Sequence, residues 1–133
     1  MARPDLFTYT GEHLAEIAFP LGGLGTGMIS LCGNGALAEW QIANRPNQRS
    51  MNPRSFFALR TRRGNQPADL RLLQGQLAPP YDQHPYEVNG RTFPGGGLGD
   101  AGMFGAPRMQ AVTFTGQYPF AHIDYRHDAV PVE

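Results

Sequence analysis

Two apolar-bearing runs on either side of Asn34 and Gly35 form the clearest pattern in the chain. Asn-Gly is the dipeptide best suited to a two-residue type I′ turn between antiparallel strands. Counting outward from this turn gives the cross-strand pairs Leu31–Ala38, Ser30–Glu39, Ile29–Trp40, Met28–Gln41 and Gly27–Ile42. A slip of one residue would turn the indole of Trp40 toward water. The pattern therefore predicts a β-hairpin with Trp40 in the core.

Four more segments carry extended or helical patterns. Residues 55–61 and 69–75 predict a second hairpin, joined by a polar loop. From Met109 the pattern is extended again, with a break expected at Gly116, and apolar and polar side chains then alternate up to residue 126. A short helical turn fits residues 11–19, and Pro20 is expected to stop it.

Prolines and glycines crowd residues 79–107 and predict a long surface loop that encloses at most a short hairpin about Asn89 and Gly90. Long loops often form a binding face. The aromatic side chains of this loop, Tyr81, Tyr86 and Phe93, are the weak candidates for substrate binding. Together these patterns predict an all-β, antiparallel β-sandwich with long Gly/Pro-rich loops.

The composition narrows the classes of function. Eleven arginines balance eleven acidic residues, so no net charge draws the protein toward nucleic acid or anionic lipid. Lysine is absent, which excludes a Schiff-base amine and the lysine of a phosphate-binding loop. Cys32 is the single cysteine, so an intrachain disulfide is impossible, and we expect it to be a small, partly buried strand residue.

Glycine-rich and histidine motifs predict neither a cofactor nor a metal. Residues 97–102 match G-x-G-x-x-G, but no strand precedes and no helix follows them, as a dinucleotide site requires. Residues 20–27 are expected to make the entry to the first hairpin. On a regular strand, His122 and Asp124 share one face while His127 falls on the other, so a metal site is not expected.

With these motifs placed, residues 17–46 resemble the opening of the N-terminal domain of family 116 glycoside hydrolases, which include non-lysosomal glucosylceramidases and bacterial β-glucosidases. The resemblance rests on a proline-led glycine run, a G-x-G turn, a tryptophan and an Asn-Arg-Pro stretch. These stand at residues 20–27, 33–35, 40 and 44–46. The segments 55–61, 71–81 and 114–133 are also similar to the family, most distinctively at Tyr118 to Ala121.

The resemblance implies that residues 1–133 are an incomplete N-terminal β-sandwich domain of a longer retaining β-glycosidase. A downstream (α/α)6 barrel would carry both catalytic carboxyl groups and the β-glucoside site, and no cofactor would be needed. We therefore expect no catalytic residue in this chain, which alone would be inactive and would pack against the barrel. Its open sheet edges predict marginal stability or self-association.

A second hypothesis is a free-standing carbohydrate-binding or protein-interaction module that uses the loop 79–107. Which β-glycoside the parent cleaves stays open between glucoside, xyloside and glucosylceramide. The N-terminal residues carry charges where a secretory signal would be apolar, so a cytoplasmic location is expected rather than a secreted one.

Overall fold

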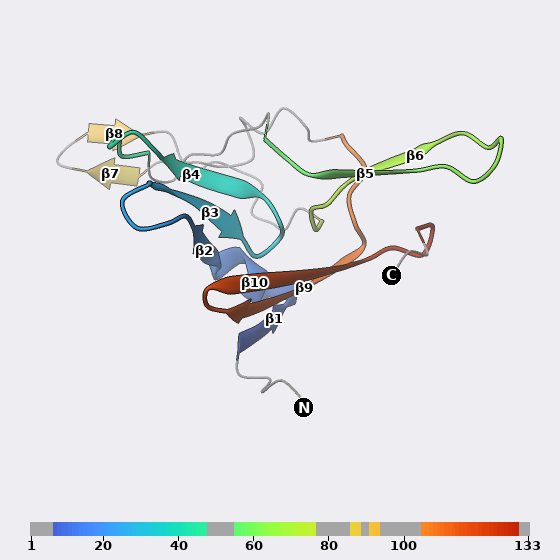
Figure 1. Cartoon of the computed structure of the whole chain (residues 1–133), viewed down its shortest axis with the longest axis horizontal. Helices are drawn as coiled ribbons and strands as arrows, with labels where there is room; N and C mark the ends of the chain where they lie inside the picture. Colours follow the sequence, from blue (N-terminus) through green and yellow to red (C-terminus); the bar gives the residue numbers. More distant parts are fainter. Residues whose placement is uncertain (1–6, 48–54, 77–85, 89–90, 94–104, 131–133) are drawn as a thin grey trace.

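The computed structural model describes residues 7–47, 55–76, 86–88, 91–93 and 105–130. Antiparallel strands make up nearly all of the regular secondary structure in the described residues, which confirms the all-β prediction (Figure 1). One sheet has the strand order β1-β9-β10 and a second has the order β2-β3-β4. Their strands are β1 (Thr8–Thr10), β9 (Ala111–Gln117), β10 (Phe120–Arg126), β2 (Ala18–Leu21), β3 (Met28–Cys32) and β4 (Leu37–Gln41).

Two further hairpins accompany these sheets. β5 (Ala58–Thr61) pairs with β6 (Asp69–Leu72) around the predicted polar loop, with Thr61 opposite Asp69. The end of β6 is tied to the segment before β9, because the N–H of Leu72 donates to the carbonyl of Pro107 at 2.8 Å. β7 (Tyr86–Val88) and β8 (Arg91–Phe93) flank Asn89 and Gly90 as predicted, while the turn itself lies outside the described residues.

The β3–β4 hairpin forms where the Asn-Gly pair predicted it, but its turn has three residues instead of two. The N–H of Cys32 donates to the carbonyl of Ala36, and the N–H of Gly35 donates to the carbonyl of Cys32. Gly35 has φ +90°, the left-handed conformation that the last residue of such a turn adopts. The extra turn residue shifts the pairing next to it, so Leu31 faces Leu37 and not Ala38 as predicted.

A β-bulge restores the predicted register farther along this hairpin. Met28 faces Gln41 as predicted, although the register shifts between Met28 and Ser30. Glu39 lies at this shift with φ +51°, so Glu39 and Trp40 together oppose Ile29. The bulge removes Trp40 from the regular alternation of faces. We predicted that Trp40 lies in the core, but its side chain is only half-buried.

The β9–β10 hairpin differs from the prediction at Gly116. β9 continues through this glycine to Gln117, and the turn comes at Tyr118 and Pro119, whose peptide bond is cis. Gly116 needs no break because it lies in the strand opposite Ala121, with the rings of Phe114 and Phe19 on its side-chain face.

A 3₁₀ helix, η2 (Gly11–Glu16), confirms the short helical turn. Pro20 does not end it, because Ile17 is already extended and Pro20 lies within β2. A proline fits there since β2 is an edge strand of its sheet. No helix within the described ranges is long and apolar enough to cross a membrane.

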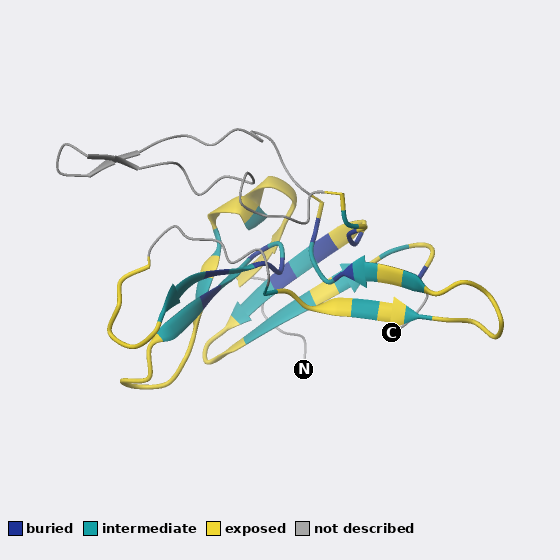
Figure 2. Ribbon diagram, turned by 90° about the horizontal axis from the view of Figure 1, so that it is seen from above, coloured by how far each residue is buried: buried dark blue, intermediate teal, exposed yellow. Residues whose placement is uncertain are grey.

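The buried core is small and lies around β9, β4 and the end of β6 (Figure 2). Phe114 is the largest fully buried side chain, at 1% exposure. Large apolar side chains exposed among the described residues outnumber those that are buried. They are Phe7, Tyr9, Leu21, Leu24, Ile42, Phe56, Phe57, Leu70, Tyr118 and Phe120. Where such side chains adjoin one another they mark faces that bind another protein, domain or ligand, whereas single ones are ordinary.

Candidate functional site: an aromatic pocket between the two sheets

A pocket of about 570 Å³ opens where the β1-β9-β10 sheet faces β2. The sheets meet at Phe19 of β2 and Phe114 of β9, whose ring centroids are 6.0 Å apart with the planes tilted by 55°. The lining residues come from the first strand, from β2 and from the end of β9. They are Phe7, Tyr9, Ile17, Ala18, Phe19, Pro20, Phe114, Thr115, Gly116, Gln117 and Tyr118.

Strand pairing explains why these distant residues meet. β1 pairs with β9 so that Tyr9 lies opposite Phe114, and the β9–β10 turn follows at Tyr118. Phe114 is buried, whereas Phe7 and Tyr118 are 57% and 83% exposed. The pocket therefore has a buried aromatic floor and an exposed aromatic rim.

The chemistry of the lining allows binding but not hydrolysis. None of the lining residues carries a carboxylate, imidazole or guanidinium group. Its polar side chains are hydroxyl and amide groups, and one of them, Thr115 Oγ1, shares a 3.2 Å hydrogen bond with Thr8 Oγ1. Glycoside hydrolysis needs two carboxyl groups placed on either side of the scissile bond. An uncharged, mainly apolar group is the ligand or segment that this pocket fits.

The binding residues predicted from the sequence lie elsewhere. Tyr81 falls outside the described residues. Tyr86 and Phe93 are partners in the β7–β8 pair. The residues that flank these two strands lie outside the described part of the chain. Their role in substrate binding stays a prediction. The aromatic pocket was missed because its two walls are separated by about a hundred positions in the sequence, although Phe7 and Tyr9 already alternate as one strand face would.

Glu39, the acid beside Trp40, is held within the sheet. Ser30 Oγ donates to Glu39 Oε2 at 2.7 Å, and Ser30 is only 1% exposed. Burial, and after it the charge of Glu39, raises the pKa of the neighbouring Cys32 thiol to about 11. Cys32 is a half-buried strand residue, as predicted from the sequence, and its thiol is protonated at neutral pH.

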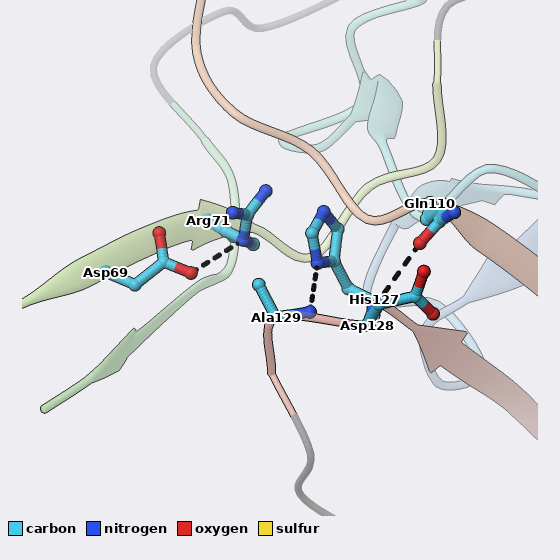
Figure 3. A network of polar contacts seen from close by, with 6 residues as sticks. All are labelled: Asp69, Arg71, Gln110, His127, Asp128 and Ala129. Atoms are coloured by element: carbon cyan, nitrogen blue, oxygen red, sulfur yellow. Dashed lines mark hydrogen bonds and ion pairs between the residues drawn. The ribbon is translucent and has the colours of Figure 1, made fainter. Parts of the chain in front are cut away.

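The polar groups at the ends of β6 and β10 make local contacts (Figure 3). Arg71 Nε pairs with Asp69 Oδ2 at 2.7 Å. His127 Nδ1 accepts a hydrogen bond from the N–H of Ala129, which holds the turn after β10. Within the described ranges no group of three His, Cys, Asp or Glu side chains could hold a metal ion.

The structure describes one of the two glycine motifs. Residues 97–102 fall outside the described part of the chain. Residues 20–27 run from β2 through a tight turn to the start of β3, which is the hairpin entry that the sequence predicted.

Comparison with known proteins identifies the family. The family model described as "beta-glucosidase 2, glycosyl-hydrolase family 116 N-term" matches residues 18–133. The chain belongs to this family. No curated protein matches it. As a family 116 N-terminal domain, the chain is part of a glycosidase, which confirms the resemblance seen in the sequence.

Proposed function

We propose that this chain is the non-catalytic N-terminal segment of a retaining β-glycosidase of the β-glucosidase or glucosylceramidase type. In this proposal residues 1–133 form part of a β-sandwich that packs against a downstream (α/α)6 catalytic barrel. The match of the N-terminal family model to residues 18–133 carries the proposal. The lack of carboxylate, imidazole and guanidinium groups in the aromatic pocket supports it, because that pocket offers binding surface without the carboxyl groups that glycoside hydrolysis needs.

The test is an assay of the 133-residue chain beside its full-length parent on an aryl β-glucoside. We expect turnover by the parent and none by the chain. Turnover by the chain at a rate comparable with the parent would overturn the proposal, and so would a parent gene with no acid-bearing helical region after residue 133.

A binding module is the second candidate, and the aromatic pocket favours it. Tyr9 and Tyr118 would then contact an uncharged sugar or aglycone. Titration of the chain with an alkyl glucoside, followed by tyrosine fluorescence, checks this candidate. A saturable change that Tyr118→Ala abolishes would support it.

We propose that the protein is located in the cytoplasm. The single cysteine supports this location, because small exported domains commonly depend on disulfides. Fractionation of cells that express the parent gene tests it.

A further inference from the structure

The outer edge of β10 is a long and regular strand edge. β10 has seven residues, and within the described part of the chain it pairs with β9 alone, without a shift of register from Phe120 to Arg126. The outer side of an edge strand leaves the N–H and C=O groups of every second residue without a partner in the sheet. A long edge of this kind is a template for pairing with another strand.

The other strand edges among the described residues carry features that oppose pairing. β1 has only three residues, β2 contains Pro20, and β4 carries the bulge at Glu39. β5, β6, β7 and β8 are strands of three or four residues. Short strands, prolines, bulges and charged side chains are the devices that keep sheet edges apart. Of these devices β10 has only charge, at Asp124 and Arg126.

The two-residue turn of the β9–β10 hairpin determines which backbone groups of β10 face outward. Gln117 and Phe120 flank this turn as partners, so they form a hydrogen-bonded pair. Hydrogen-bonded and non-hydrogen-bonded pairs alternate along an antiparallel ladder. The N–H and C=O groups of Ala121, Ile123 and Tyr125 therefore point away from β9, toward the open edge.

One face of β10 carries polar side chains that have no partner of opposite charge. Asp124 and Arg126 are exposed and His122 is half-buried. Within the described residues these three side chains make no hydrogen bond or ion pair. β9 places only uncharged residues opposite them, and Phe120, 66% exposed, completes the row. The charges on this face are thus available to a strand on the open side.

A second copy of β10, placed antiparallel beside the first, matches this row because the row is self-complementary about Ile123. With Ile123 opposite the partner's Ile123, His122 faces the partner's Asp124 on both sides of the axis, and Phe120 faces the partner's Arg126. These pairs fall at non-hydrogen-bonded positions, where Cα atoms lie about 4.5 Å apart and side chains are closest. An imidazole then meets a carboxylate, and a guanidinium meets an aromatic ring.

Neighbouring registers lack this match. Backbone groups face outward at every second residue, so alternative registers differ by two residues. A shift in one direction places Asp124 opposite the partner's Asp124 and His122 opposite the partner's Arg126. A shift in the other direction places His122 opposite the partner's His122. Like charges directly opposite are destabilising, so charge selects the register that pairs the whole of β10.

We propose that two copies of this chain associate through β10 in the antiparallel register centred on Ile123. The two sheets then form one continuous sheet with the strand order β1-β9-β10-β10-β9-β1. The contact is isologous, so it closes at a dimer. This inference goes beyond the proposed function and does not rest on it.

Asp124→Arg tests the proposal, with Asp128→Arg as the matched control. Both replace an exposed aspartate by arginine, but Asp128 lies in the turn after β10 and outside the proposed pair. Sedimentation equilibrium of the 133-residue chain measures the dimer dissociation constant. We expect Asp124→Arg to raise this constant at least about tenfold and Asp128→Arg to leave it unchanged. Circular dichroism should show the same strand content in both variants and in the wild type.

A second substitution tests the pairing itself. Adding His122→Asp to Asp124→Arg again places opposite charges across the dimer axis, so we expect it to recover most of the lost affinity. Amide hydrogen exchange followed by NMR tests the register in the wild type without any variant. The N–H groups of Ala121, Ile123 and Tyr125 should be protected in the dimer and exposed on dilution to the monomer.

Four results would overturn the inference. The first is a chain that stays monomeric at every concentration, and the second is an equal effect of Asp124→Arg and Asp128→Arg. The third is protection on association at β1 instead of β10, which assigns the contact to another edge. The fourth is protection of the outward β10 amides in the monomer, which shows that another segment of the same chain covers this edge. None of these measurements uses glycosidase activity, so each result leaves the proposed function to its own test.

Discussion

The β3–β4 and β9–β10 hairpins are both antiparallel pairs joined by tight turns, yet they differ in regularity. β9 and β10 pair without interruption from Ala111 opposite Arg126 to Gln117 opposite Phe120. β3 and β4 need a three-residue turn and a bulge at Glu39 within five-residue strands. β9 is also the central strand of its sheet and contributes Phe114 to the core.

The difference separates a hairpin that carries the largest buried side chain from one whose turn and bulge depart from regular pairing. The regular hairpin buries Phe114 and holds no residue at positive φ. The irregular hairpin holds Glu39 at positive φ, and Ala43 and Asn44 follow β4 in the same conformation. Bulges are over-represented where a sheet edge must redirect a side chain or end its pairing. The four substitutions below test this comparison.

Phe114→Ala should have the largest effect. The ring is 1% exposed and packs against Phe19, so its removal leaves a cavity between the sheets. We expect the free energy of unfolding to fall by about 3–5 kcal/mol, measured by urea denaturation. The control is Phe120→Ala, at a position 66% exposed on the same hairpin. Equal losses for the two variants would show that the β9–β10 hairpin does not form the core.

Gly35→Ala tests the three-residue turn. Gly35 has φ +90°, and a side chain there would collide with the hydroxyl of Tyr125 and come within 2.6 Å of the carbonyl of Leu73. We expect a loss of about 2–3 kcal/mol in the free energy of unfolding. Gly105→Ala is the matched control, because a side chain at Gly105 meets nothing within 4 Å. Equal tolerance of both substitutions would contradict this placement of Gly35.

Ser30→Ala tests the contact that faces the bulge. It removes the buried hydroxyl that donates to Glu39 at 2.7 Å, so the bulged carboxylate loses a donor. We expect the free energy of unfolding to fall by about 1–2 kcal/mol. Thr8→Val, which removes the exposed hydrogen bond to Thr115, serves as the comparison and should change stability by less than about 0.5 kcal/mol. A larger loss of stability for Thr8→Val than for Ser30→Ala would contradict this, because the exposed hydrogen bond would then contribute more than the contact at the bulge.

The smallest effect is a pH dependence from Cys32. Burial raises the pKa of its thiol from an ordinary value of 9.0 to about 11 in the folded chain, so the unfolded chain loses this proton first as the pH rises. Stability is therefore complete below pH 9 and declines from there toward pH 11. Between pH 9 and 10 the loss should be about 1 kcal/mol. Urea denaturation at both pH values measures it, and Cys32→Ala should remove that loss. If the free energy of unfolding of Cys32→Ala falls just as much between pH 9 and 10, another group causes the pH dependence.

Local chemistry explains what could be predicted from the sequence. The Asn-Gly pair located the β3–β4 hairpin, and the polar loop located β5–β6. The register near the turn was missed because Asn-Gly also fits a three-residue loop in which only the glycine takes positive φ. The bulge at Glu39 has no local signature, since it depends on the contact with Ser30 across the sheet.

The candidate site was harder to predict because it depends on distant pairing. β1 has only three residues and pairs with β9 about a hundred positions away. Periodicity in a short window cannot detect such a strand. Phe7, Tyr9 and Tyr118 could therefore not be assigned to one pocket, and the predicted aromatic residues came from the proline-rich loop instead.

The most direct test of the non-catalytic role is to find where a covalent intermediate forms. A 2-deoxy-2-fluoro-β-glucoside traps the glycosyl-enzyme of a retaining glycosidase on its nucleophile. Peptide mapping by mass spectrometry of the labelled full-length parent then locates the modified carboxylate. We predict one labelled peptide that lies after residue 133. A label on Glu39, or on any other acid within residues 1–133, would contradict the account.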